Sequence, residues 1–459
     1  MTIRNRLLSR TLASFAFLGA LWVTAELSRV PAQQGGKGQE RLNYDEKAYT
    51  ARLQDIRAMF KGEAPADKNT MDLAAQHYAY RLTLTDLQNK KDKMPYLVRE
   101  VISELDSNRR DDRRASDAAR LFNEALVTRL KEVLPNPRPI ASINAAIILD
   151  HMAKHGNEEA ADALAGALAD KDMNDGTKFW AARGLHDFFV LAFPAGEEQP
   201  ITFKDKAREA RCVSALLSTF DLKSPQNPPA NSEEIEGLRR LRHEVIRALG
   251  VSRFPSVVDG KGVSQSKTAL ALCRVLRSDG LNPPPRLDEQ IEAAIGIAML
   301  KMAPSKEYKP ANEYQPDVSA CHLARFVVDY SRRHQNRKED NKAQPSQAHP
   351  WKTSAARLEI ALGALKNEVA AMNRNDPNKY KNAVAYINEV FRLTLPILKS
   401  IEADSSGAAA EPLADFLEKS PRDDQPVYKG DPNSVVKPGG AALATEPAKE
   451  KPATEEKKK

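Results

Sequence analysis

Apolar residues along this 459-residue chain recur every three or four positions, the spacing of helices, rather than every second position as in strands. The clearest stretch is 140–189, in which AAIILDHM (145–152) and AARGLHDF (181–188) repeat one small-and-apolar pattern. Each block follows a turn-rich break, and a second amphipathic helix lies between them. This arrangement is typical of stacked helical repeats. Because such a unit cannot bury its apolar face alone, we expect further repeats on either side.

The same spacing predicts helices over most of the chain. We expect N-terminal capping helices in 42–117, helical repeats in 118–402 and a short terminal helix in 403–420. Asp376 and Pro377 have the residue types of a helix N-cap and first turn, and the helix that they begin should bend or break near Pro396. Residues 421–459 are rich in Pro, Lys, Glu and Gly, which predicts a disordered tail.

The second helices of the predicted pairs share one frame: AAIILDHM (145–152), AARGLHDF (181–188), VIRALGVS (245–252), AAIGIAML (293–300) and LEIALGAL (358–365). This frame resembles the Ala-Ala-x-Ala-Leu-Gly-x-Ile pattern in the second helix of HEAT-type repeats. The resemblance implies an all-α fold, a right-handed α-α superhelix of the HEAT or armadillo type. Long loops at 223–232, 253–264 and 334–349 make the repeats irregular. A non-repetitive helical bundle is the alternative fold.

The N-terminal 32 residues have the pattern of a signal peptide. Arg4, Arg6 and Arg10 form a basic head, and the apolar run from Leu12 to Val23 is shorter than the ~20 apolar residues of a membrane-spanning helix. Residues 33–41 form a polar, flexible lead. We therefore expect an exported protein, periplasmic or extracellular, with no transmembrane segment after signal removal. An uncleaved membrane anchor is the alternative.

Charge and cysteine content narrow the function classes. The formal net charge is +7, and residues 1–32 hold four Arg and one Glu, so about +4 remains on the rest, too little to indicate nucleic-acid binding. The three cysteines, Cys212, Cys273 and Cys321, do not form a disulfide framework. Cys273 and Cys321 lie on apolar helix faces, which favours packing, and a bridge between them is the alternative.

One group of residues has the types that bind divalent metals. Asp150 and His151, and then His186 and Asp187, occupy the same two frame positions of successive second helices. Helices that run side by side about 8–10 Å apart would bring these four groups together, which suits Zn²⁺ or another divalent ion. His155, one turn beyond His151, could add a ligand. The alternative is an ordinary Asp–His contact near a helix C-terminus.

A basic ridge is the second candidate. It lies on two successive second helices and consists of Arg183, Arg239, Arg240, Arg242 and Arg247, with His243 among them. The HEAT resemblance implies that second helices line a concave face, where this ridge would receive an acidic partner. Interleaved glutamates favour instead a solvated face with pairs such as Arg240 and Glu244.

No motif of nucleotide binding, serine hydrolysis, zinc proteolysis or haem attachment is present. The sequence therefore favours an exported, non-catalytic protein-binding or scaffold protein that uses a helical-repeat surface. Its expected partner is a protein or peptide, an acidic one if the basic ridge forms the binding surface, and no cofactor is expected. The alternative is a metal-binding protein or enzyme with a divalent ion on adjacent repeat helices.

Overall fold

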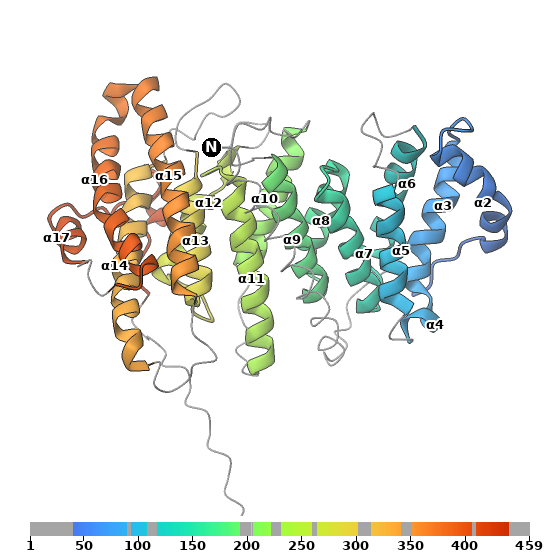
Figure 1. Ribbon diagram of the computed structural model, residues 1–459, viewed down its shortest axis with the longest axis horizontal. Helices are drawn as coiled ribbons and strands as arrows, with labels where there is room; N and C mark the ends of the chain where they lie inside the picture. The colour runs from blue at the N-terminus through green and yellow to red at the C-terminus, as the bar shows by residue number, and fades with distance from the viewer. Residues whose placement is uncertain are drawn as a thin grey trace, which may run out of the picture. The chain divides into compact units, whose positions relative to one another are not determined.

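The computed structural model describes residues 40–89, 93–107, 117–192, 203, 205–221, 231–258, 264–301, 314–340, 350–405 and 410–439. The chain divides into two compact units, 1–219 and 220–459. Helices make up nearly all the regular structure of the described residues (Figure 1). The predicted all-α class is therefore confirmed. The predicted signal peptide (1–32), and the predicted lead (33–41) except its last two residues, lie outside the described residues.

The first unit consists of helices that pack on their neighbours along the chain. They are α2 (Glu46–Phe60), α3 (Lys68–Tyr80), the 3-10 turn η2 (Arg81–Thr83), α4 (Thr85–Gln88), α5 (Lys93–Ser107), α6 (Asp117–Val133), α7 (Pro139–Ala153), α8 (Glu158–Ala169), α9 (Asp175–Ala192) and α10 (Lys206–Phe220), which ends at the unit boundary. Helix α7 contacts both α8 and α9. The side chains of Asp45, Asp67 and Asn157 begin α2, α3 and α8 as N-caps.

The second unit repeats this kind of packing. Its elements are α11 (Ser232–Ser252), strands β1 (Val257–Val258) and β2 (Ser264–Ser266), α12 (Thr268–Arg277), α13 (Leu287–Met299), α14 (Pro316–Asp340), α15 (Trp351–Asn375), α16 (Pro377–Glu402), α17 (Glu411–Lys419) and the 3-10 turn η4 (Pro432–Ser434). The two strands pair antiparallel, with Val257 opposite Ser266. Helix α11 packs on α13, α13 on α15, and α12 on α14. Helix α17 lies within 403–420, where the sequence predicted a short terminal helix.

Helix α16 does not break at its internal proline. It runs through Pro396 to Glu402, beginning at the predicted Asp376 cap, whose side chain accepts a hydrogen bond from the amide of Lys379 (3.0 Å). Proline removes one helical hydrogen bond, but Ile397, with Leu398 and Ile401, is buried beyond it. Tertiary packing therefore sustains the last turns.

Two helix crossings, one in each unit, share one register. In the first, Ser142 of α7 contacts Thr177 of α9, with the hydroxyl oxygens 2.9 Å apart, and a Cβ on Gly184 would lie 3.0 Å from Cα of Asp150. Asp150 follows Ser142 by eight residues, and Gly184 follows Thr177 by seven. Because the two contacts follow the same order on both helices, α7 and α9 run in the same direction.

The second crossing joins α11 and α13. Arg242 binds Glu289 (Nε–Oε1 2.6 Å), and a Cβ on Gly296 would lie 2.8 Å from Cα of Gly250. On α11, Gly250 follows Arg242 by eight positions, and on α13, Gly296 follows Glu289 by seven. When the frame deduced from the sequence is extended toward the N-terminus, these contacts involve the same four positions as in the first crossing. The polar contacts join a residue three places before one block to a residue four places before the next. The sixth frame position of one helix thus meets the fourth of the next.

The C-terminal segment corrects the sequence prediction. Residues 421–439, assigned to a disordered tail, pack into the second unit with Val427, Tyr428 and Val436 buried. The amide of Gln315 donates to the carbonyl of Val427 (2.9 Å), and Asp431 forms an ion pair with Lys267. Three apolar side chains with backbone partners are enough to order a segment whose composition is otherwise polar. Residues 440–459 lie outside the described part of the chain.

Candidate functional site

The crossing register explains why the predicted metal set does not assemble. Asp150 lies against Gly184, not against His186. His186 comes two residues after Gly184, which places it about 200° further around α9 and away from the contact with α7. It pairs instead with its own neighbour, with His186 Nδ1 2.8 Å from Asp187 Oδ1. The prediction that Asp150, His151, His186 and Asp187 converge assumed that equal frame positions face each other, and this was wrong.

His151 turns toward a different helix. Its Nε2 lies 2.8 Å from Oδ1 of Asp106, near the end of α5, and His155 Nε2 lies 3.8 Å from the same oxygen. The two imidazole rings meet edge to face, with their centroids 4.6 Å apart. Among the described residues, this is the place where ligand atoms of three His, Cys, Asp or Glu side chains lie within 4.8 Å of one another.

Sequence reasoning named two of these three residues and missed the carboxylate. The spacing of four between His151 and His155 is visible in the sequence. Asp106 is separated from His151 by 45 residues, and no periodicity relates α5 to α7. Its signal in the sequence is only that of an acid at the end of a predicted helix, before a charged turn. The contact is therefore a product of tertiary packing.

The His186–Asp187 pair on α9 is a structural contact. Burial raises the pKa of Asp187, but the hydrogen bond and charge of His186, with the charges of Arg183 and Lys154, outweigh it and leave the pKa below its usual value. The Asp187 side chain is therefore an ion at neutral pH. Because His186 already occupies it, this carboxylate holds its own helix surface together rather than presenting a vacant ligand.

The basic ridge loses its central member. Arg242 is 3% exposed and Glu289 is 1% exposed. The guanidinium also donates from Nη1 to the carbonyl of Pro283 (2.6 Å) and from Nη2 to Glu289 Oε2 (3.1 Å). Such a buried, bidentate pair cannot meet a partner protein. The assignment of Arg242 to a binding surface was wrong, because its position in the frame faces α13.

The other arginines of α11 remain at the surface. Arg240 is exposed and makes no ion pair with another described residue. Arg239 lies 3.4 Å from Glu236, and Arg247 lies 2.9 Å from Glu244, each measured from guanidinium nitrogen to carboxylate oxygen. Half-exposed pairs of this kind contribute little to stability and leave cationic groups accessible. The α11 part of the ridge therefore consists of Arg239, Arg240 and Arg247.

Arg183, the remaining member, belongs to the first unit. Its guanidinium lies 4.8 Å from the ring centroid of Trp180, one turn earlier on α9, in a cation–π contact. The other four arginines belong to the second unit. The cationic surface of α11 is therefore made of arginines of the second unit alone.

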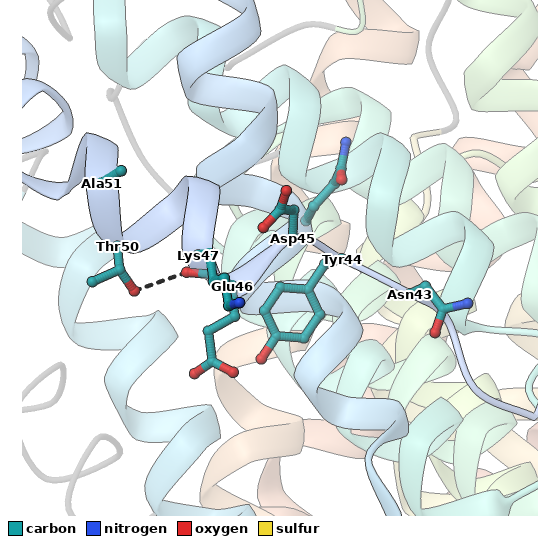
Figure 2. A pocket seen from close by; sticks show the side chains of 8 residues that line it. Asn43, Tyr44, Asp45, Glu46, Lys47, Thr50 and Ala51 are labelled. Carbon is teal, nitrogen blue, oxygen red and sulfur yellow. Dashed lines mark hydrogen bonds between the residues drawn. The ribbon is translucent and has the colours of Figure 1, made fainter.

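A hollow of about 1080 Å³ lies at the start of α2. Figure 2 shows the polar side chains around it, and the hydroxyl of Thr50 donating to the carbonyl of Glu46 (2.8 Å). Asp45, one of the lining residues, is engaged as the N-cap of α2 through the amide of Ala48 (2.9 Å). The side chains that line the hollow serve local helix structure and do not converge on one point.

An aromatic cluster around His77 shares Tyr44 with this hollow. The His77 ring stacks on Tyr49 with centroids 3.6 Å apart and meets Tyr44 edge to face at 5.5 Å. Burial, with the nearby charge of Arg81, lowers the pKa of His77 to about 4. His77 is therefore neutral at neutral pH and packs as an aromatic residue, with Nε2 3.1 Å from Arg81 Nη1.

A smaller hollow of about 380 Å³ lies in the second unit. Three arginines, Arg277, Arg325 and Arg332, line it together with Asp329, Glu418 and Asp423. Opposite charges are balanced in this lining, and Arg325 pairs with Asp423 (Nε–Oδ2 3.4 Å). The balance gives the hollow no clear preference for an anion or a cation.

The three cysteines are free and buried, so the packing interpretation is confirmed against a Cys273–Cys321 bridge. Cys273 Sγ lies 3.7 Å from the hydroxyl oxygen of Ser319. Burial raises the pKa of the Cys273 thiol to about 12 and also raises those of Cys212 and Cys321. Thiols that stay protonated and covered are poor nucleophiles and metal ligands.

No family model, curated protein or solved structure matches the chain. Among the described helices, none combines the length and the apolar character needed to cross a bilayer.

Proposed function

We propose that this protein is an exported, non-catalytic scaffold that binds a partner protein through the surface of stacked HEAT-like helix pairs. The supporting observation is the register shared by the α7–α9 and α11–α13 crossings. Two helix pairs from different units use the same four frame positions for their contacts. Chance packing of a non-repetitive bundle has no reason to reproduce that register, whereas internal repeats do.

A repeat stack suits binding rather than catalysis. Each repeat contacts its neighbours and leaves a continuous helical surface on which a partner can lie. The three thiols are buried, and His77 is enclosed by aromatic rings. The right-handed superhelix and the export of the protein, the latter resting on the pattern of residues 1–32, are parts of the same proposal.

The surface that we assign to the partner is the exposed side of α11. Arg239, Arg240 and Arg247 provide cationic groups at its surface, while Arg242 fixes the helix to α13. Fixing a helix by a buried pair keeps the exposed groups of the same helix in place, which favours recognition of a matching acidic surface. The expected partner is an acidic protein or peptide segment.

Charge reversal on α11 tests this assignment. The full chain and its Arg239→Glu/Arg240→Glu variant would be used as baits in a cross-linked envelope extract, and the affinity of the purified partner then measured. We expect at least ~10-fold weaker binding, with the wild-type affinity falling as salt rises. The matched control is Arg374→Glu/Arg392→Glu, which reverses two exposed arginines of α15 and α16 in the same unit.

The outcomes separate the proposals. Equal loss of binding in both double variants would mean that only net charge matters, and the absence of any specific partner would contradict the scaffold function. The superhelix is tested separately by small-angle X-ray scattering of the exported form. A repeat stack should be elongated or curved, and a compact particle would favour the helical bundle.

A further inference from the structure

The ends of α5 and α7 place two imidazoles around one carboxylate, and we propose that Asp106, His151 and His155 form a binding site for a divalent transition-metal ion such as Zn²⁺. The proposal does not depend on the partner binding of α11, because the site lies in the first unit. Its donors are two ring nitrogens and one carboxylate oxygen, a set that zinc accepts together with water.

The distances suit a metal. Zinc ligands lie ~2.0–2.1 Å from the ion, so neighbouring donor atoms of a tetrahedral site are about 3.4 Å apart. The two measured distances to Asp106 Oδ1, 2.8 Å from His151 Nε2 and 3.8 Å from His155 Nε2, fall on either side of that value. Shifts of about half an ångström would bring both distances to Asp106 Oδ1 to the spacing of a tetrahedral site, and the three donor atoms all lie within 4.8 Å of one another.

The backbone holds the second histidine near the first. His151 and His155 are four residues apart, which keeps both on one side of the end of α7. The amide of His155 donates to the carbonyl of Met152 (3.1 Å), and Gly156 takes φ of 85°, where glycine is unstrained. Asn157 then caps α8 through the amides of Glu159 and Ala160. The turn is therefore fixed on both sides of His155.

The electrostatic setting favours a cation. Both α5 and α7 end close to the three side chains, at Ser107 and Ala153, and helix C-termini carry partial negative charge. The carboxylate of Asp106 adds a full negative charge. The exposed fractions of the Asp106, His151 and His155 side chains are 43%, 19% and 29%, so an ion can enter and retain water in its remaining positions.

A plain Asp–His contact explains less. The hydrogen bond of His151 to Asp106 alone would tie α5 to α7, and His155 would then have no reason to lie 3.8 Å from the same oxygen. Metal binding gives all three side chains a role. On binding, each ligating Nε2 must be free of its proton, so the His151 proton moves to Nδ1 or to solvent, and Asp106 exchanges its hydrogen bond for a metal bond.

Titration of the full chain with Zn²⁺ by calorimetry, and with Co²⁺ by visible absorption, tests the site. We expect one ion per chain, a Co²⁺ spectrum of low coordination number, and in His155→Ala and Asp106→Asn a loss of affinity of at least ~10–100-fold. His155→Ala is the decisive variant because it leaves the His151–Asp106 hydrogen bond in place. Circular dichroism of each variant verifies that the helices remain.

The matched control is His186→Ala, which removes a histidine of α9 that pairs with Asp187. This variant should bind Zn²⁺ as tightly as the original chain. Unchanged affinity in His155→Ala, equal losses in His155→Ala and His186→Ala, or no stoichiometric binding by the original chain would each overturn the proposal.

Discussion

The α7–α9 and α11–α13 crossings have the same backbone geometry but different chemistry. At one end of each, a glycine lets two helices approach: Gly184 over Asp150 in the first, and Gly296 against Gly250 in the second. At the other end a buried polar contact joins the helices. Ser142 and Thr177 share a hydrogen bond between hydroxyls in the first unit, where the second unit has an ion pair.

This difference shows which features the repeat frame fixes. The small residue at the fourth frame position is required because a neighbouring backbone occupies the place of a side chain. The polar residue that lies eight places before the sixth frame position needs only a partner for its buried polar group. A pair of neutral hydroxyls and a pair of opposite charges both provide one. The two crossings therefore differ in side chains while they keep one register.

Removing the guanidinium of the second crossing should have the largest effect. Arg242→Met leaves the carboxylate of Glu289 buried without its partner, and we expect a loss of about 3–5 kcal/mol in the free energy of unfolding of the second unit. Urea unfolding followed by fluorescence of Trp351 measures it. Replacing both partners, as in Arg242→Met/Glu289→Leu, should restore much of the loss. A double variant as unstable as the single one would show that the pair itself is needed.

Filling the glycine contact should come next. Gly296→Ala places a Cβ 2.8 Å from Cα of Gly250 and 3.1 Å from Leu272 Cδ1, so we expect a loss of about 2 kcal/mol despite the better helix propensity of alanine. The control is Gly363→Ala in α15, where a Cβ meets nothing within 4 Å and should add up to ~1 kcal/mol. Changes of equal sign in the two variants would contradict a close crossing at Gly296.

The polar contact of the first crossing should matter less than its charged counterpart. Ser142→Ala removes the bonds to Thr177 and to Asn174 Nδ2 (2.8 Å), and we expect a loss of about 1 kcal/mol because no charge is left buried. Unfolding of the first unit, followed by fluorescence of Trp180, tests this. A loss as large as that of Arg242→Met would contradict the expectation that removing a neutral partner lowers the free energy of unfolding less than removing a charged one.

The smallest effect should be a loss of stability at neutral pH that disappears in acid. The pKa of Asp187 is lower in the folded protein than in the unfolded chain, so its contribution to stability is present above the unfolded pKa and is lost as pH falls through the folded one. Asp187→Asn should therefore be less stable than the original chain near neutral pH and equally stable at low pH. Met299, at the same frame position of α13, cannot titrate. A stability difference in Asp187→Asn that is independent of pH would contradict this role.

The sequence by itself determined the helical class and much of the local detail. Three- and four-residue spacing placed the helices, and the polar cap of Asp376 appears where the residue types predicted a helix start. In the overlay of second helices, the residues that form the two crossings also occupy equivalent positions. These features depend on residues close in the chain, whose periodicity and capping chemistry can be read directly.

Only the tertiary structure decided which residues meet. An offset of two frame positions placed Asp150 over Gly184, and an offset of one position placed Arg242 against Glu289. The separate packing of α5 on α7 brought Asp106 to His151. The arginine-rich sequence of α11 does not by itself distinguish a buried arginine from an exposed one. Contacts between helices depend on their relative shift and rotation, which packing sets by closing space around small residues, and a chain's own periodicity does not specify either one.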